Sequence, residues 1–255
     1  MESKMYLNDG EYSLAYCHHT GRSPGILFLG GFRSDMTGIK AMALDQYCRD
    51  KGIGFTRFDY MGHGQSSGDF FDGRIGLWLD NARRILAHVA TGPQILVGSS
   101  MGGWLSLLLA RQYPEKIVGL IGVAAAPDFT EQLIWDALSK TQKAQVEQQG
   151  FIERQSEYEE TPHKISMGFI IEARQHLLLD TPISCHFPVH LLHGQKDVSV
   201  PWSVALRLLE HIDGHDARLT LIKGGGHRLS APDDIQLLLE TVEAMYQKVA
   251  EEHDG

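Results

Sequence analysis

The sequence contains little cysteine. Only Cys17, Cys48 and Cys185 occur among 255 residues, and an odd, widely spaced set argues against a disulfide framework and is typical of a reducing compartment. Long apolar runs are also missing, since no stretch approaches the roughly 18 residues that a membrane-spanning helix needs. The first residues show neither the apolar core of a secretory signal nor the arginines of a transit peptide. These absences predict a cytoplasmic protein without stable membrane insertion.

Basic residues are outnumbered by acidic ones. The chain has 23 Lys and Arg against 32 Asp and Glu, which gives a net charge of −9, and such a balance disfavours binding to phosphate backbones. The metal-binding spacings H-E-x-x-H and C-x-x-C do not occur, and neither does a G-x-G-x-x-G or Walker A loop. We therefore expect no nucleic-acid partner, no metal and no cofactor, while the oligomeric state stays open.

Short apolar segments alternate with longer amphipathic ones along most of the chain. Hydrophobic residues make up 43% and charged residues 22%, a balance that at this length is typical of a single globular domain over residues 1–255. The alternation predicts an α/β fold with a mostly parallel sheet and helices on both of its faces. A hairpin over 5–7 and 12–18, with a turn at Asn8-Asp9-Gly10, is expected to precede it. The predicted strands cover 25–29, 54–59, 94–97, 117–123, 189–192 and 217–222, and the predicted helices cover 39–51, 75–90, 101–113, 201–211 and 233–251.

The alternation stops between Pro127 and Pro182. This segment is polar and helical in pattern, shows no convincing strand, and ends in a predicted helix over 164–179. It is too short to bury a core of its own, so we interpret 128–182 as a helical cap inserted after the sixth strand. Acidic residues gather in it at Glu147, Glu153, Glu157, Glu159 and Glu160. Its apolar residues, which either line an acyl-chain tunnel or pack against the body of the protein, are Leu133, Ile134, Trp135, Met167, Phe169 and Ile170.

A G-x-S-x-G sequence lies between a predicted strand and a predicted helix. Gly98-Ser99-Ser100-Met101-Gly102 follows the apolar run ending at Val97 and opens a helical stretch. In this context the pattern indicates a nucleophile elbow, a sharp turn that exposes the hydroxyl of Ser100. The two glycines allow strand and helix to pack closely around the turn.

A serine hydroxyl needs a base and an acid to become a nucleophile. His227 follows the strand at 217–222 and the flexible Gly224-Gly225-Gly226, and Asp197 follows the strand at 189–192. Both therefore lie beyond strand ends, in the chain order Ser, Asp, His that this architecture uses. Asp128, after the preceding strand, is the competing acid, and His193 is interpreted as a structural residue beside Asp197.

An oxyanion hole requires two backbone N–H donors. One is expected from Met101, the residue after the nucleophile. The other is expected from the loop after the strand at 25–29, where Gly30-Gly31 precedes Phe32.

Several segments together resemble the α/β-hydrolase superfamily. Asp59-Tyr60-Met61-Gly62-His63-Gly64-Gln65-Ser66 is similar to its D-x-x-G-x-G-x-S turn, and Leu192-His193-Gly194-Gln195-Lys196-Asp197 is similar to the segment that carries its acid. The stretches at 31–41 and 97–104 resemble the group around α/β-hydrolase domain-containing protein ten, whose members are palmitoyl-protein thioesterases and acyl-glucuronide esterases. The resemblance implies Ser100, Asp197 and His227 as the triad. One departure is Gly30-Gly31, where many members have His-Gly before the oxyanion residue.

These features predict a serine hydrolase that cleaves carboxylic esters or thioesters of a small molecule or an acylated protein through an acyl-enzyme. Two alternatives stay open. A prolyl-aminopeptidase-like peptidase would need carboxylates such as Glu153 or Glu172 to bind a substrate amino terminus. A non-catalytic ligand-binding protein on the same fold would bind a small molecule without turnover. A haloalkane dehalogenase is disfavoured, because its nucleophile would be an aspartate in place of Ser100.

Overall fold

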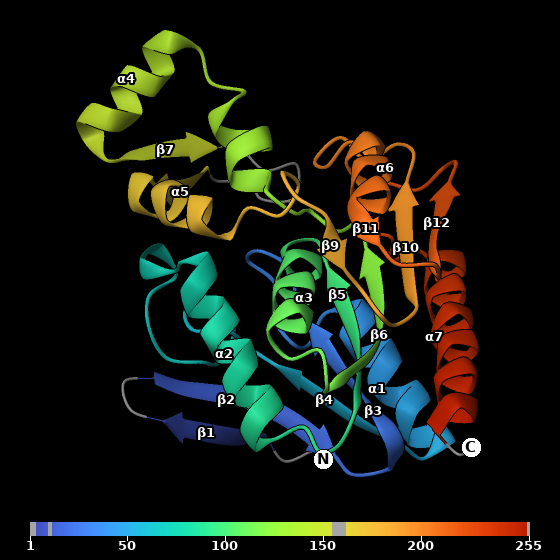
Figure 1. Ribbon diagram of the computed structural model, residues 1–255. Helices are drawn as coiled ribbons and strands as arrows, with labels where there is room; N and C mark the ends of the chain where they lie inside the picture. Colours follow the sequence, from blue (N-terminus) through green and yellow to red (C-terminus); the bar gives the residue numbers. More distant parts are fainter. Residues whose placement is uncertain (1–3, 10–11, 155–161, 254–255) are drawn as a thin grey trace.

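An eight-stranded sheet forms the centre of the molecule (Figure 1). The structure is a computed structural model, and it describes residues 4–9, 12–154 and 162–253. The strand order is β1-β2-β4-β3-β5-β6-β10-β12. The first two strands and the β2–β4 pair are antiparallel, and the remaining neighbours are parallel, which confirms the predicted mostly parallel sheet. Of the predicted hairpin turn, Gly10 lies outside the described residues. The strands are β1 Met5–Asp9, β2 Tyr12–His19, β3 Arg22–Leu29, β4 Ile53–Phe58, β5 Gln94–Ser99, β6 Ile117–Val123, β10 Val189–Gly194 and β12 Ala217–Ile222.

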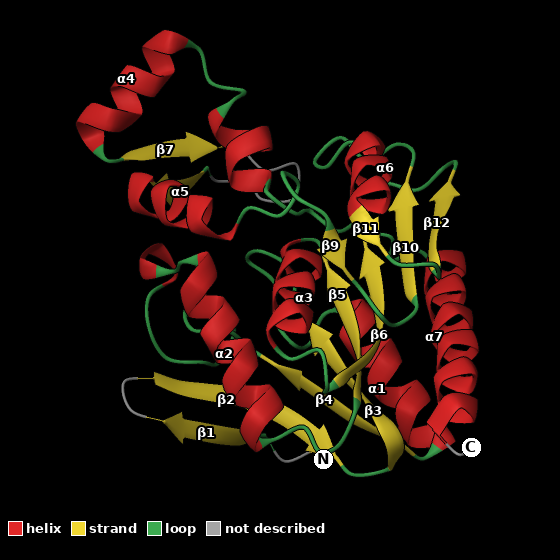
Figure 2. Ribbon diagram, in the orientation of Figure 1, coloured by secondary structure: helices red, strands yellow, loops and turns green. Residues whose placement is uncertain are grey.

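Helices cover both faces of the sheet (Figure 2). Strand β3 shows why both must be covered: Ile26 and Phe28 point into one apolar cluster, while Leu27 and Leu29 point into the other, because successive side chains of a strand alternate between its faces. Helices α1 and α7 pack on the first face, and α2 and α3 on the second. The helices are α1 Ile39–Lys51, α2 Ile75–His88, α3 Met101–Gln112, α6 Trp202–His211 and α7 Pro232–His253.

The segment at 128–182, which we call the cap segment, projects above the end of the sheet at which β6 and β10 finish (Figure 1). It contains α4 Lys140–Gln149 and α5 Met167–Ala173, with a π-helical stretch at Thr130–Trp135 and a 3-10 turn at Arg174–His176. The expectation that it holds no strand is wrong, because β7 Phe151–Arg154 pairs with β8 His163–Ser166. Glu157, Glu159 and Glu160 lie outside the described residues.

The end of the cap segment also differs from its predicted helix over 164–179. The first residues of that range pair in β8, and Ser166 then starts α5 by accepting a hydrogen bond at Oγ from the Phe169 amide at 3.1 Å. Such an N-cap satisfies an amide that the helix itself cannot bond. The helix therefore begins later and ends earlier than its apolar pattern indicates.

Three short elements complete the described fold. They are a 3-10 turn at Phe70–Asp72 and the two-residue strands β9 Ile183–Ser184 and β11 Ile212–Asp213, which pair with each other. No helix in the described ranges is both long enough and apolar enough to cross a membrane.

Candidate active site

Ser100 occupies the turn between β5 and α3, with φ 54° and ψ −118°. Few residues with a side chain adopt this conformation, and close packing holds it in place. A Cβ atom on Gly102 would lie 2.0 Å from the Leu29 carbonyl oxygen, and one on Gly98 would lie 2.4 Å from the Gly102 carbonyl oxygen. The sequence needs glycine on both sides of Ser100 because β3, β5 and α3 meet there.

The loop after β12 brings His227 to Ser100. The Nε2 atom of His227 lies 3.0 Å from Ser100 Oγ, and its Nδ1 atom lies 2.7 Å from Asp197 Oδ2. These residues come from the ends of three different strands and meet at one edge of the sheet. The hydroxyl faces one ring nitrogen while the carboxylate faces the other, which is the arrangement a nucleophilic serine needs.

Asp197 is held by the loop that follows β10. Its Oδ1 atom accepts hydrogen bonds from the Ser199 and Val200 amides at 2.9 and 2.8 Å. His193 Nε2 lies 3.4 Å from Oδ2 and 2.9 Å from the Val200 carbonyl oxygen. Burial alone would raise the pKa of Asp197, but contacts with His193 and His227 outweigh it and hold that pKa well below its usual range. The carboxyl group therefore stays ionised and able to orient His227.

Asp128, the competing acid, has a different function in the fold. Its two oxygens accept hydrogen bonds from the Leu178 and Leu179 amides at 2.9 and 2.8 Å. Burial raises its pKa. Asp128 thereby ties the first residue of the cap segment to the place where the chain returns to the sheet.

The two predicted oxyanion donors belong to backbone segments next to the nucleophile. Met101 is the first residue of α3, where backbone amides have no partner within the helix. Phe32 follows Gly31 in the loop after β3, and a Cβ on Gly31 would lie 3.4 Å from Ser100 Cβ. The loop backbone thus passes directly beside the serine.

A cavity of about 430 Å³ opens at Ser100 and His227. It extends toward the start of α1, and its charged lining consists of Arg33, Asp35, Lys40 and Arg228. Lys40 Nζ donates a hydrogen bond of 2.5 Å to the Arg228 carbonyl oxygen, next to His227. None of the six apolar cap residues proposed for an acyl tunnel lines this cavity.

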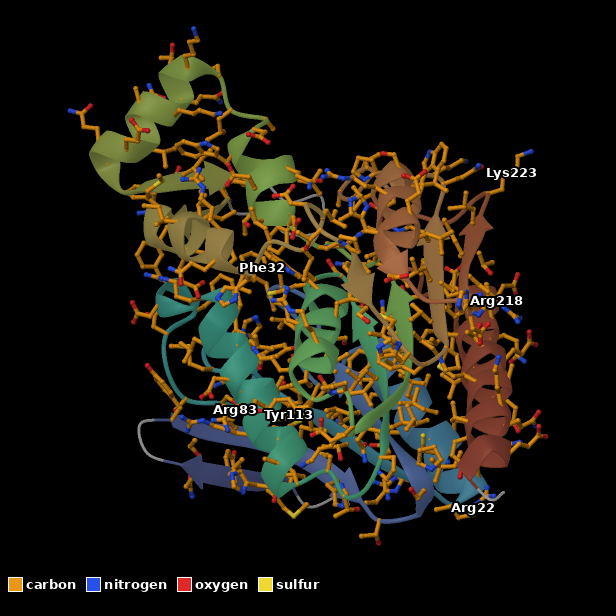
Figure 3. The ribbon with its side chains drawn as sticks, viewed as in Figure 1. Arg22, Phe32, Arg83, Tyr113, Arg218 and Lys223 are labelled. Atoms are coloured by element: carbon orange, nitrogen blue, oxygen red, sulfur yellow. The ribbon has the colours of Figure 1, made fainter. Side chains whose placement is uncertain are left out.

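Packed aromatic rings, which we call the aromatic cluster, connect Phe32 in the lining of this cavity to the cap segment. Phe32 is at its centre, with ring centroids 4.9 to 5.9 Å from those of its neighbours. Figure 3 shows Phe32 below the cap segment, near the upper ends of α2 and α3. The cluster joins the cap segment to the rest of the protein, which we call the body. The rings next to Phe32 are Phe70 and Trp78 from the body and Phe129 and Phe169 from the cap segment.

Comparison with known proteins agrees with this architecture. Residues 26–166 match the family model described as serine aminopeptidase, S33. The mouse protein named palmitoyl-protein thioesterase ABHD10, mitochondrial, is 41% identical over 97% of this chain and 84% of its own length. The solved structure of mouse α/β-hydrolase domain-containing protein 10 covers 97% of this chain and 99% of its own, with 42% identity and a TM-score of 0.92. A putative hydrolase from Agrobacterium vitis S4 has 36% identity and a TM-score of 0.91, over 96% of this chain and 98% of its own.

The chain therefore belongs to the α/β-hydrolase family, in the group that includes ABHD10. The fold and the resemblance that the sequence predicts are both confirmed by these relatives.

The prediction of a cytoplasmic protein is contradicted by the same comparison. The relatives from mouse and human are both named as mitochondrial. Few and widely spaced cysteines indicate a reducing environment, and that property does not distinguish one reducing compartment from another.

Proposed function

We propose that this chain hydrolyses carboxylic thioesters and esters through an acyl-enzyme formed on Ser100. The observation that carries the proposal is the chain of contacts from Ser100 Oγ through His227 to Asp197, at 3.0 and 2.7 Å. His227 Nε2 takes the hydroxyl proton as Oγ attacks the acyl carbonyl carbon, and Asp197 stabilises the imidazolium that results. The amides of Met101 and Phe32 donate hydrogen bonds to the oxyanion, each contributing about 3 kcal/mol to transition-state stability.

The acyl-enzyme then forms and breaks down by the same groups. The tetrahedral intermediate collapses, the bond from the carbonyl carbon to sulfur or oxygen breaks, and the leaving thiol or alcohol takes the proton from His227 Nε2. Water next gives a proton to His227 and attacks the acyl carbon, and a second collapse returns the proton to Ser100 Oγ with release of the acid. No metal or cofactor takes part in these steps.

The substrate is proposed from the relatives together with the layout of the site. ABHD10 of mouse is named a palmitoyl-protein thioesterase, and we propose an acylated protein or a small acyl ester or thioester for this chain as well. We further propose that residues 1–255 act as one domain, in which the cap segment roofs Ser100 through the aromatic cluster. Substrate selection is then shared by the aromatic cluster and the cavity beside α1.

The aminopeptidase alternative has less support. Neither Glu153 nor Glu172 lines the cavity at Ser100, and Glu172 Oε1 already accepts hydrogen bonds from the Gly76 amide at 3.0 Å and from His176 Nε2 at 2.7 Å. Carboxylates that lie outside this cavity are poorly placed to bind a substrate amino terminus beside Ser100.

The substitution Ser100→Ala tests the proposal. We expect it to reduce turnover of short p-nitrophenyl esters and acyl thioesters to background and to prevent labelling by a fluorophosphonate probe, since both require Oγ. Aminoacyl arylamides serve as the peptidase control. Turnover of esters by the Ser100→Ala variant at the native rate would refute the assignment, and labelling of the native chain without turnover would favour the ligand-binding alternative.

A further inference from the structure

His63 is almost fully buried beside the loop that follows β3, with 4% of its surface exposed. It belongs to the turn after β4 and is outside the proposed triad. Its ring lies against Tyr60, Phe70 and Trp78, with centroids 5.1 to 5.6 Å apart. A buried imidazole that takes no part in the chemical steps requires another explanation.

The hydrogen bonds of His63 fix its tautomer. Nδ1 lies 3.1 Å from the Met61 carbonyl oxygen, which can only accept, so Nδ1 carries the hydrogen. Nε2 accepts a hydrogen bond from the Arg33 amide at 3.2 Å, and since an amide N–H can only donate, Nε2 carries no hydrogen. Burial lowers the pKa of His63 to about 4, although the hydrogen bond that Nδ1 donates to the Met61 carbonyl oxygen opposes this shift. The ring therefore stays neutral and presents an acceptor to Arg33.

The Arg33 amide belongs to a strained turn. The Ser34 amide donates to the Gly31 carbonyl oxygen at 3.2 Å, which closes a β-turn over 31–34. Arg33, its third residue, has φ 59°, whereas Phe32 is not among the residues with positive φ. These signs define a type II turn, whose third position favours glycine. Arginine there is disfavoured relative to the type I form, in which the third residue has negative φ.

The two turn types differ by a flip of the central peptide. In this turn the central peptide joins Phe32 to Arg33, and its N–H donates the hydrogen bond that His63 Nε2 accepts. A flip would remove that N–H from Nε2 and direct the Phe32 carbonyl oxygen toward the same lone pair. His63 therefore selects the type II form of a turn whose second residue is the proposed oxyanion donor.

The far end of the loop is fixed separately. Asp59 Oδ1 accepts a hydrogen bond from the Met36 amide at 2.7 Å, and the Arg57 guanidinium donates one to the Met36 carbonyl oxygen at 2.7 Å. The segment between Gly31 and Met36 is thus held at both ends by the strand β4 and the turn that follows it. Of these contacts, the one from His63 lies nearest to Phe32.

We propose that His63 is a positioning residue for the oxyanion hole, acting through the Arg33 amide to hold the Phe32 amide beside Ser100. The inference rests on the proposed function, because it requires Phe32 to bind the oxyanion. A preorganised donor contributes to catalysis only if it is already in place when charge develops, and small displacements reduce rate strongly. His63 therefore affects the transition state more than substrate binding.

Two variants of His63 separate this role from a general structural one. In His63→Gln, the side-chain Oε1 can reach the position of Nε2 and accept from Arg33. In His63→Asn, the side-chain amide can replace Nδ1 at Met61 but leaves the Arg33 amide without its acceptor. We expect kcat of His63→Asn to fall about 10- to 100-fold with KM within about twofold of native, and His63→Gln to stay within about threefold in kcat.

The variant Arg33→Gly supplies an independent readout. Glycine adopts positive φ without a steric penalty, so the turn no longer depends on His63. Because Arg33 also lines the cavity at Ser100, its substitution is measured in both backgrounds, and we expect Arg33→Gly to raise kcat about tenfold more in His63→Asn than in the native chain. Thermal unfolding of each variant confirms that the comparison is made between folded proteins.

The outcomes are distinguishable from those of the proposed function. Equal losses in His63→Gln and His63→Asn, native kcat in His63→Asn, or no rescue by Arg33→Gly would each overturn the positioning role. If Ser100→Ala is inactive while one of these results is obtained, the hydrolase assignment stands and the role of His63 fails. If Ser100→Ala keeps full activity, the function itself is wrong.

Discussion

The sheet body and the cap segment contribute to the site in different ways. The body supplies the polar groups of the proposed chemistry, Ser100, Asp197 and His227, from the loops after three strands, and His227 lies 3.0 Å from Ser100 and 2.7 Å from Asp197. The cap segment supplies aromatic rings and ties to the body, such as the bond from Trp104 Nε1 to the His176 carbonyl oxygen at 3.1 Å. In the proposed mechanism the side chains of the cap segment do not contact the reacting atoms, so we expect attachment of the cap segment and chemistry to be separable everywhere except at Phe32, which belongs to both.

The largest expected effect comes from the body. The substitution Asp197→Asn leaves the side-chain shape but favours the wrong tautomer of His227, so we expect kcat to fall about 10⁴-fold. The matched control is Asp128→Asn, another buried aspartate, which holds Leu178 and Leu179 and should reduce stability while keeping kcat within about threefold of native. Steady-state kinetics and thermal unfolding of both variants provide the measurement. Comparable losses of kcat in the two would show that cap anchoring and chemistry are not separate.

A smaller effect is expected where the two regions meet. Phe169 is 3% exposed and packs on Phe32, Phe129 and Trp78. We expect Phe169→Ala to lower the free energy of unfolding by about 3–5 kcal/mol, and to shift preference toward longer acyl chains, because it opens space beside Phe32. Denaturant unfolding and a chain-length series of acyl thioesters measure the two effects. Ile171→Ala, on the half-exposed face of the same helix, is the control and should change neither.

The smallest effect is expected on the outside of the cap segment. Arg174 forms a two-pronged ion pair with Glu131, at 2.7 and 3.2 Å, and its guanidinium lies 5.1 Å from the centre of the Trp135 ring. Both charged side chains are partly exposed, so Arg174→Ala should lower the free energy of unfolding by less than about 1 kcal/mol. We expect kcat and KM to stay at their native values. A tenfold change in kcat would contradict the separation of roof and reaction.

The sheet was predictable because its signals are local and repeated. Strands 117–123 and 217–222 have the bounds that the sequence predicts, and helix α1 ends at Lys51 as predicted. Gly52 explains that end, since it adopts φ 66° and its amide bonds to the carbonyl oxygens of Cys48 and Arg49. The meeting of Ser100, Asp197 and His227 was also foreseeable, because strand ends of a parallel sheet converge at one edge.

The cap segment was less predictable for a physical reason. Strand β7 has only four residues, Phe151–Arg154, and it gains its partner from β8 across an intervening stretch of chain. Four residues are too few for a period-two pattern to be distinguished from a helical one. Pairing with a separate short segment, rather than local preference, decides such a strand.

Contacts that join distant side chains to backbone were missed for a similar reason. The turn that carries His63 could be recognised from its glycines, yet the bond from the Arg33 amide to His63 joins residues 30 positions apart. The aromatic cluster likewise draws on Phe32, Phe70, Trp78, Phe129 and Phe169, which no local pattern connects. Once the backbone is known, the positive φ of Arg33 points to the hydrogen bond between its amide and His63.

The backbone conformation of Ser100 limits the stability of this protein against unfolding. At φ 54° and ψ −118° the backbone of Ser100 is strained, whereas glycine, which lacks Cβ, adopts these angles without strain. We therefore expect Ser100→Gly to unfold at a higher temperature than Ser100→Ala, while both variants lack hydrolytic activity. The turn that carries the Ser100 hydroxyl therefore costs the protein some stability.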